Sequence, residues 1–261
     1  MKKFISLFLV LIMLLLPAAC GGGSGTQTAK EPEADYTSVY PVGAYALNDG
    51  IYEIEVESSS SMFRVVHCDL AVEGGKMTAY MSMSAEGYGY VFPGKIADAE
   101  TAAEEERIPF DRDKDGKKRF AFEIDALDTE YDCAAYSIKK DAWYDRVLVF
   151  KSDSIPETAY VKPVTVDVTL SGGSGRASIK SPCELYRKTG LDTAVIVWSS
   201  DHYEYMLMDE LQYDPIQSEG NSTFALPVIF DKDIAVSGLT TAMSEPHLID
   251  YSLNFDSKSI R

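Results

Sequence analysis

The sequence predicts an all-β fold built from two similar β-sandwiches. Apolar and polar residues alternate in short segments such as 146–150 and 164–170, which is the pattern of half-buried strands. Turns that contain glycine, among them Glu73-Gly74-Gly75 and Asp115-Gly116, separate these segments. Many short strands with such breaks are typical of a sandwich. The one segment that indicates a helix is 97–107, which is rich in Ala and Glu and falls in a loop of the first sandwich.

A repeat divides the chain into two parts. At a constant offset, residues near position 70 match residues near position 185, and the endings LVFKSDSI and LNFDSKSI also correspond. The matching pairs are Cys68 and Cys183, Leu70 and Leu185, Gly75 and Gly190, Thr78 and Thr193, Ala79 and Ala194, Ser84 and Ser199, Tyr88 and Tyr203, and Tyr90 and Tyr205. Two copies are too few for a solenoid, which needs at least three. We therefore predict two tandem domains of one fold, at 43–157 and 158–261.

The N-terminus has the layout of an export signal. Lys2 and Lys3 precede an apolar run over 4–16, and two small residues stand directly before Cys20. The run is shorter than the ~20 residues of a spanning helix. We predict a lipoprotein signal peptide at 1–19 and a lipidated Cys20 that anchors the protein to the extracellular face of the membrane. The alternative is a plain secretory signal. Residues 20–42, rich in Gly and polar residues, are expected to form a flexible linker.

Charge and motif content exclude several functions. The chain has 41 acidic and 24 basic residues and a formal net charge of −17, so nucleic acid, which needs a basic face, is not an expected partner. With three histidines, no Gly-x-Ser-x-Gly elbow and no phosphate loop, the sequence indicates a protein that is not an enzyme. No metal site is predicted either. Asp111-x-Asp113-x-Asp115-Gly116 begins like a calcium loop, but Phe122 stands where the loop needs a bidentate Glu, so a hairpin turn is expected.

Several segments resemble the near-iron-transporter (NEAT) domains, the β-sandwich haem-binding modules of Gram-positive cell surfaces. These are Ser60-Ser61-Met62-Phe63, 239–241, and the closing strands that end near Phe150 and Phe255. The blocks 136–140 (YSIKK) and 143–146 (WYDR) are similar to clostridial lipoproteins linked to iron uptake. The resemblance implies two immunoglobulin-like or NEAT-like β-sandwiches that bind haem or an iron chelate. Haem-binding members carry Tyr-x-x-x-Tyr on the second-last strand, and Lys140 and Tyr144 occupy those positions here.

The resemblance singles out two groups of candidate ligand-binding residues. Ser61, Met62, Phe63 and Arg64 correspond to the short helix that covers the ligand in haem-binding members; the alternative is a turn whose Met and Phe pack on the core. The second group is Tyr136, Trp143, Tyr144 and Arg146. Aromatic residues with polar tips suit a site with one apolar and one wet end, although tyrosines are also ordinary strand residues. Tyr88 and Tyr90 add to this group of aromatics, but they recur in the second repeat, which favours a structural role.

The resemblance implies an extracellular, membrane-anchored lipoprotein that captures haem or another iron source for uptake, with haem as its possible cofactor. The first repeat is the expected binding module, because it holds both groups of candidates. The alternative is a cell-surface adhesion or interaction module that binds a protein or a glycan. Iron-related or polysaccharide-related neighbouring genes would distinguish the two.

Three cysteines remain if Cys20 carries lipid. Cys68 and Cys183 fall at the same place on an inward-facing strand, and Cys133 aligns with Val236. The series Cys68, Met83, Cys133, with Trp198 in place of Met83 in the second repeat, resembles the Cys…Trp…Cys core of immunoglobulin sandwiches. That resemblance implies a Cys68–Cys133 disulfide and a buried free thiol at Cys183. The alternative is that all three are free core thiols.

Overall fold

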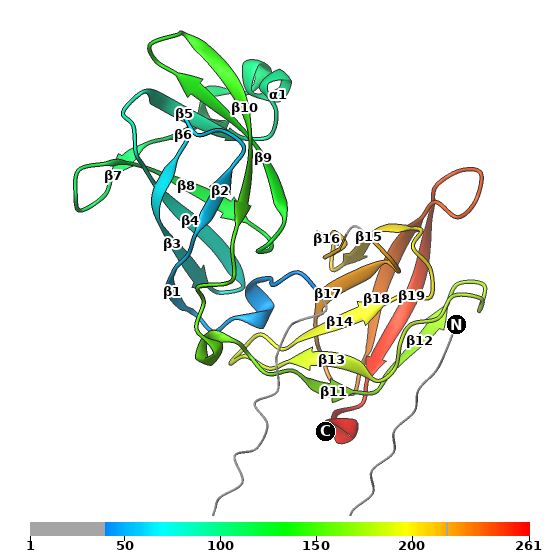
Figure 1. Ribbon diagram of the computed structural model, residues 1–261. Helices are drawn as coiled ribbons and strands as arrows, with labels where there is room; N and C mark the ends of the chain where they lie inside the picture. The colour runs from blue at the N-terminus through cyan, green and yellow to red at the C-terminus, as the bar shows by residue number, and fades with distance from the viewer. Residues whose placement is uncertain (1–39, 218) are drawn as a thin grey trace, which may run out of the picture. The chain divides into compact units, whose positions relative to one another are not determined.

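The structure, a computed structural model, describes residues 40–217 and 219–261, and nearly all of their regular structure is β-strand. The strands form four antiparallel sheets (Figure 1), which confirms the predicted all-β class. The predicted signal peptide, Cys20 and most of the predicted linker lie outside the described residues. Val42, at the end of that linker, already packs in the first core.

The first half of the chain forms two five-stranded sheets, in the orders β1-β3-β4-β8-β7 and β2-β10-β9-β5-β6. Its strands are β1 (Gly50–Glu53), β2 (Val56–Ser58), β3 (Val65–Glu73), β4 (Lys76–Met83), β5 (Tyr88–Pro93), β6 (Ile108–Pro109), β7 (Asp111–Arg112), β8 (Lys118–Ile124), β9 (Glu130–Ser137) and β10 (Ala142–Phe150). Along β3 and β8, buried and more exposed side chains alternate, so each strand has one face toward the core and one toward solvent.

The second half forms a four-stranded sheet, β11-β13-β14-β17, and a five-stranded sheet, β12-β19-β18-β15-β16. Its strands are β11 (Val164–Val166), β12 (Val168–Gly172), β13 (Cys183–Tyr186), β14 (Thr193–Val197), β15 (Tyr203–Met208), β16 (Leu211–Tyr213), β17 (Thr223–Pro227), β18 (Asp233–Thr240) and β19 (His247–Phe255). Short 3-10 helices occur at Ala44–Ala46, Glu104–Glu106, Glu157–Ala159 and Ser257–Ser259.

The strand order of the first half recurs in the second half, with β7 as the one addition. Local details recur as well. The register shifts between Tyr88 and Tyr90 in β5 and between Tyr203 and Tyr205 in β15. Asp128 and Asp231 both have positive φ, and the carboxylate of each accepts hydrogen bonds from the amide and hydroxyl of one serine, Ser152 or Ser257. The matching LVFKSDSI and LNFDSKSI endings therefore build the same turn.

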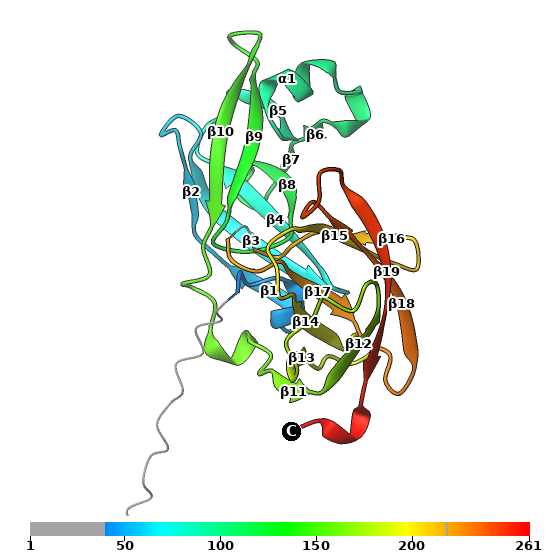
Figure 2. The same cartoon turned by 90° about the vertical axis from the view of Figure 1, so that its right-hand side faces the viewer.

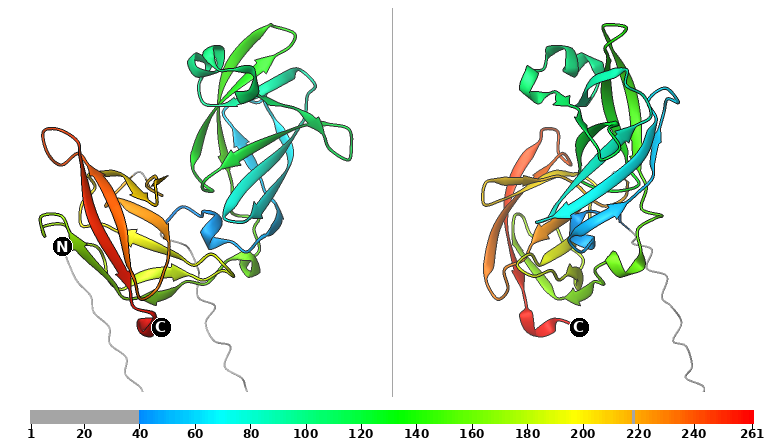
Figure 3. Two further views of the ribbon diagram at one scale, coloured as in Figure 1. Left: turned by 180° about the vertical axis from the view of Figure 1, so that it is seen from behind. Right: turned by 90° about the vertical axis from the view of Figure 1, so that its left-hand side faces the viewer.

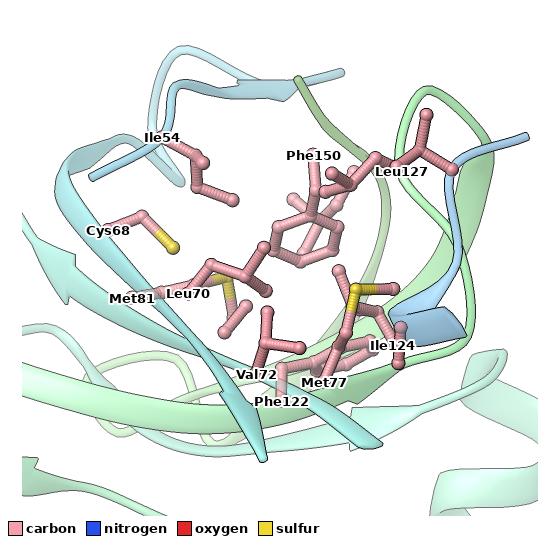
Figure 4. Packing of buried hydrophobic residues seen from close by; sticks show 14 of the residues in the cluster. Ile54, Cys68, Leu70, Val72, Met77, Met81, Phe122, Ile124, Leu127 and Phe150 are labelled. Atoms are coloured by element: carbon pink, nitrogen blue, oxygen red, sulfur yellow. The ribbon is translucent and has the colours of Figure 1, made fainter. Parts of the chain in front are cut away.

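Two groups of buried side chains form the cores. In the first, Phe122 and Phe150 (Figure 4) stack with 6.0 Å between their ring centroids. Tyr131 packs edge-on against both rings. The hydroxyl of Tyr131 accepts hydrogen bonds from the amides of Asp125 and Ala126 and so closes the β8–β9 turn. The first group also includes Tyr186 and Val195, from β13 and β14. In the second group, Trp198 is 1% exposed.

The predicted helix is shorter than expected. Helix α1 (Ile96–Thr101) ends at Thr101, and the backbone of Ala102 is extended (Figure 2). The guanidinium of Arg107 donates to the carbonyls of Ala99 and Ala102, and the carboxylate of Glu106 accepts from the amide of Ala103. These side chains take the backbone groups that a continuous helix would pair internally, so only a 3-10 turn follows.

The predicted Cys68–Cys133 disulfide is not formed; Cys68, Cys133 and Cys183 are all free, buried thiols. Cys68 lies on β3 and Cys133 on β9, in different sheets. Both thiols belong to the first core, where each is buried as a small apolar side chain. Inward parity alone therefore does not predict a bridge, which also needs the two positions to lie opposite each other across the core. Cys183 is a free thiol in the same core as Trp198, as predicted.

Candidate functional site

The candidate residues of the β9–β10 hairpin lie on both of its faces. Figure 3 shows the two strands of the hairpin, in green, side by side. Along β10, Tyr144 and Arg146 share parity with the buried Leu148 and Phe150, so they continue the core-side face toward the hairpin end. Trp143 has the opposite parity and pairs with Tyr136 on β9. The sheet therefore divides Trp143 from Tyr144, although they are neighbours in the chain.

The turn over residues 59–64 is fixed at both ends. Ser59 exchanges two hydrogen bonds with Val147 on β10, each 2.9 Å long. The carbonyl of Arg64 accepts from the amide of Ser84, which follows β4. Within the turn Phe63 is fully buried, whereas 76% of Met62 is exposed. The segment was expected either to cover a ligand or to be a turn whose Met and Phe pack on the core. Phe63 packs on the core, whereas Met62 faces solvent.

Tyr88 connects this turn to β10. Its ring packs edge-on against Phe63, with 5.0 Å between centroids. Its hydroxyl lies 3.4 Å from the carbonyl of Met62 and 3.5 Å from Nη2 of Arg146. The guanidinium of Arg146 lies over the ring of Tyr144, 5.3 Å from its centroid. We call Met62, Phe63, Tyr88, Tyr144 and Arg146 the inner cluster.

Tyr136 and Trp143 belong to a second, outer cluster. Their ring centroids are 5.3 Å apart, and Tyr90 lies 6.3 Å from Tyr136. The guanidinium of Arg107 lies 5.7 Å from the Trp143 ring. The hydroxyl of Tyr136 donates to the carboxylate of Asp141, and this bond raises the pKa of that phenol. Since Arg107 comes from the segment between β5 and β6, the outer cluster is a packing contact between that segment and the β9–β10 hairpin.

The structure therefore brings together Met62, Phe63, Tyr144 and Arg146, and it places Tyr136 and Trp143 elsewhere. Ser61 and Arg64 are exposed in the turn. Tyr88 was expected to have a structural role, and Lys118 was not predicted as a site residue. Lys118 is 4% exposed, and its ammonium donates to the carbonyl of Tyr88 at 2.7 Å. The parity of Lys118 with the buried Phe120 and Phe122 on β8 was the available signal.

Two shallow hollows lie on the solvent face of the β3 sheet, away from the inner cluster. One, of about 420 Å³, is lined by Glu53, His67, Asp69, Asp113, Lys114, Asp115 and Arg119. The other, of about 650 Å³, includes Ile51, Ala71 and Tyr80. None of the predicted ligand-binding residues lines either one. The nitrogens of His67 lie 3.2 Å from Glu53 and 3.1 Å from Asp69.

The acidic segment 111–116 forms the predicted hairpin turn between β7 and β8. One carboxylate oxygen of Asp113 accepts from the amides of Asp115 and Lys117, each at 2.9 Å. That carboxylate is therefore occupied by its own turn. In the part of the chain that the structure describes, no three His, Cys, Asp or Glu side chains gather as metal ligands. Within residues 40–217 and 219–261, no helix has the length and apolarity needed to cross a bilayer.

Comparison with models of known protein families and with curated proteins gave no match.

Proposed function

We propose that this protein is an extracellular, membrane-anchored binding lipoprotein that captures haem or another flat iron-containing ligand through the inner cluster. The observation that carries the proposal is the meeting of Met62 with Tyr144 and Arg146 through Tyr88, from segments far apart in the sequence. Methionine adapts to flat ligands, and a phenolate oxygen suits ferric iron. The two tandem NEAT-like domains belong to this proposal, supported by the strand order that recurs in the two halves.

Tyr144 is the phenol of the cluster that is best placed to reach iron. It is 37% exposed, whereas the hydroxyl of Tyr88 is already engaged by the Met62 carbonyl and Arg146. In the Tyr-x-x-x-Tyr pattern the first tyrosine ligates iron, and Lys140 stands at that position, so ligation by Tyr144 would use the second position, on β10. A bound ferric ion would therefore take its protein oxygen ligand from β10.

Titration of ferric haem into residues 21–261 tests this proposal. That form keeps the compact unit 38–261 intact and avoids detergent. We expect a Soret change at micromolar haem. Tyr144→Phe removes the oxygen ligand and should weaken ferric haem binding by at least about tenfold, roughly one lost charge-assisted contact. Binding of metal-free protoporphyrin should stay unchanged in that variant.

Tyr136→Phe is the matched control, because it deletes the same atom on the opposite face of the hairpin. Its haem affinity should equal that of the wild type. Equal losses in both variants would show a general effect on the hairpin rather than iron ligation. No Soret change in the wild type would remove the haem proposal and leave the adhesion alternative.

The lipid anchor has its own test at Cys20. Cys20→Ser removes the thiol that receives the lipid, so we expect the protein to move almost entirely from the membrane fraction to the soluble fraction. Metabolic labelling with a radioactive fatty acid should mark the wild type and leave the variant unlabelled. An unlabelled wild type that is released from cells would favour the plain secretory signal.

A further inference from the structure

We propose that the ligand of the inner cluster is anionic and that the guanidinium of Arg146 receives its carboxylate or a similar oxyanion. This inference rests on the proposed function and specifies the chemistry of the ligand at the same site.

Arg146 has no anionic partner among residues 40–217 and 219–261. Its Nε has no exposed surface and no hydrogen-bond partner. Nη1 donates to the carbonyl of Asp145, the preceding residue, and Nη2 reaches the Tyr88 hydroxyl only at 3.5 Å. Among the described residues, no carboxylate lies within ion-pair distance of it. Arg112, Arg119, Arg187 and Arg261 each have such a carboxylate, and of the described arginines without one only Arg107 shares a buried Nε without a partner.

Arg146 has no such partner among the described residues, although the chain has 41 acidic residues against 24 basic ones. A partly buried charge without a partner is costly. A guanidinium has a planar fork of N–H donors that matches a carboxylate edge. A ligand carboxylate would supply the hydrogen-bond acceptor that no described residue offers to the Nε of Arg146.

Lys118 adds a second positive charge at the other end of Tyr88. Its ammonium bonds the Tyr88 carbonyl at 2.7 Å and lies 4.0 Å from the ring centroid of Phe110. Burial lowers the pKa of Lys118, which is the expected effect of removing a cation from water. Glu86 is the carboxylate whose charge raises that pKa in part, and Glu86 is itself paired with Arg112 at 3.1 Å. Two cations thus flank Tyr88 in a strongly acidic protein, and their field favours an anion at this place.

The neighbouring surface defines the rest of the ligand. Met62 and Tyr144 are exposed on either side of the Tyr88–Arg146 contact. They offer an apolar thioether and an aromatic ring to the body of the ligand. We therefore infer a flat, apolar ligand with an anionic edge.

The test compares metal-free protoporphyrin, a flat dicarboxylate, with its uncharged dimethyl ester, using residues 21–261. Both probes lack iron, so ligation by Tyr144 does not enter. We expect the wild type to bind the dicarboxylate at least about tenfold more tightly than the ester, since a charge-assisted hydrogen bond contributes about 1.5–3 kcal/mol. Arg146→Gln should bring the ratio close to one, and Arg146→Lys, which keeps the charge but loses the fork, should keep part of it.

Arg107→Gln is the matched control, because Arg107 also has a buried Nε without a partner but belongs to the outer cluster. Its ratio should equal that of the wild type. Equal binding of acid and ester by the wild type would overturn the anion inference and leave the proposed function standing. If neither porphyrin binds, the proposed function fails, and this inference fails with it. A preference for the acid that is as large in Arg146→Gln as in the wild type would also overturn the assignment.

Discussion

Replacing Trp198 with alanine is expected to lower the free energy of unfolding of the second half of the chain by about 3–5 kcal/mol, the usual cost of a large buried aromatic. Trp198 is 1% exposed and stacks on Tyr203 with 3.9 Å between centroids. Tyr251 packs edge-on against Trp198 with 5.0 Å between ring centroids. The indole N–H of Trp198 points to the sulfur of Met206 at 3.4 Å. The residues around it are held by a hydrogen bond of 2.8 Å between the hydroxyls of Tyr203 and Tyr251. They cannot easily collapse into the space that the indole leaves.

Denaturant unfolding followed by circular dichroism measures this loss. Trp143→Ala is the matched control: it removes the other of the two tryptophans, which lies half-exposed in the outer cluster, and should cost no more than about 1 kcal/mol. It also leaves Trp198 as the single indole fluorophore. If the two halves unfold in separate steps, Trp198→Ala should shift one step and leave the other in place. Similar losses for the two variants would contradict the packing described here.

The fold class could be predicted because its causes are local. Alternating burial along β3 and β8 is visible in the sequence as alternating apolar residues, and the turns carry the glycines that positive φ requires, as at Gly74 and Gly116. Asp128 and Asp231 could also be matched from the sequence, because each precedes a serine at the same position of the matching chain endings. In the structure each aspartate accepts a hydrogen bond from that serine. The helix was predicted too long because two side chains of the predicted segment itself, those of Glu106 and Arg107, take backbone groups that a continuous helix would pair internally.

The candidate site could be predicted only in part. Strand parity alone would have separated Trp143 from Tyr144, since neighbours on a strand face opposite ways. By contrast, the contact between Lys118 and the Tyr88 carbonyl joins two sheets, and no local pattern records the distance between sheets. The disulfide prediction was wrong for a related reason. Parity identified inward-facing cysteines, but a bridge also needs the two positions to lie opposite each other across the core.

The three core thiols are expected to be almost unreactive in the folded protein. Burial raises the pKa of Cys68, Cys133 and Cys183 from 9.0 to about 12. Since the thiolate is the reactive form, such a shift lowers its population roughly thousandfold near neutral pH. We expect a maleimide or iodoacetamide probe to leave native 21–261 almost unlabelled over minutes. The same protein unfolded without reductant should take up three labels, as read by intact mass. A single labelled thiol in the unfolded, unreduced protein would instead show that Cys68 and Cys133 are bridged.

The raised thiol pKa values also predict a pH dependence of stability. A thiol whose pKa is higher in the folded state stabilises the fold fully below the unfolded value of 9.0, and this stabilisation is lost as pH rises toward about 12. Between pH ~7.5 and ~9.5 we expect a loss of about 0.8 kcal/mol per thiol, or roughly 2–3 kcal/mol for the three. Replacing all three cysteines with alanine should remove most of this slope, whatever the variant's own stability. The remainder comes from tyrosines such as Tyr45 and Tyr203, whose pKa burial also raises. A slope that is unchanged in the variant would mean that other groups, not the thiols, take up the difference in protons between the folded and unfolded chain.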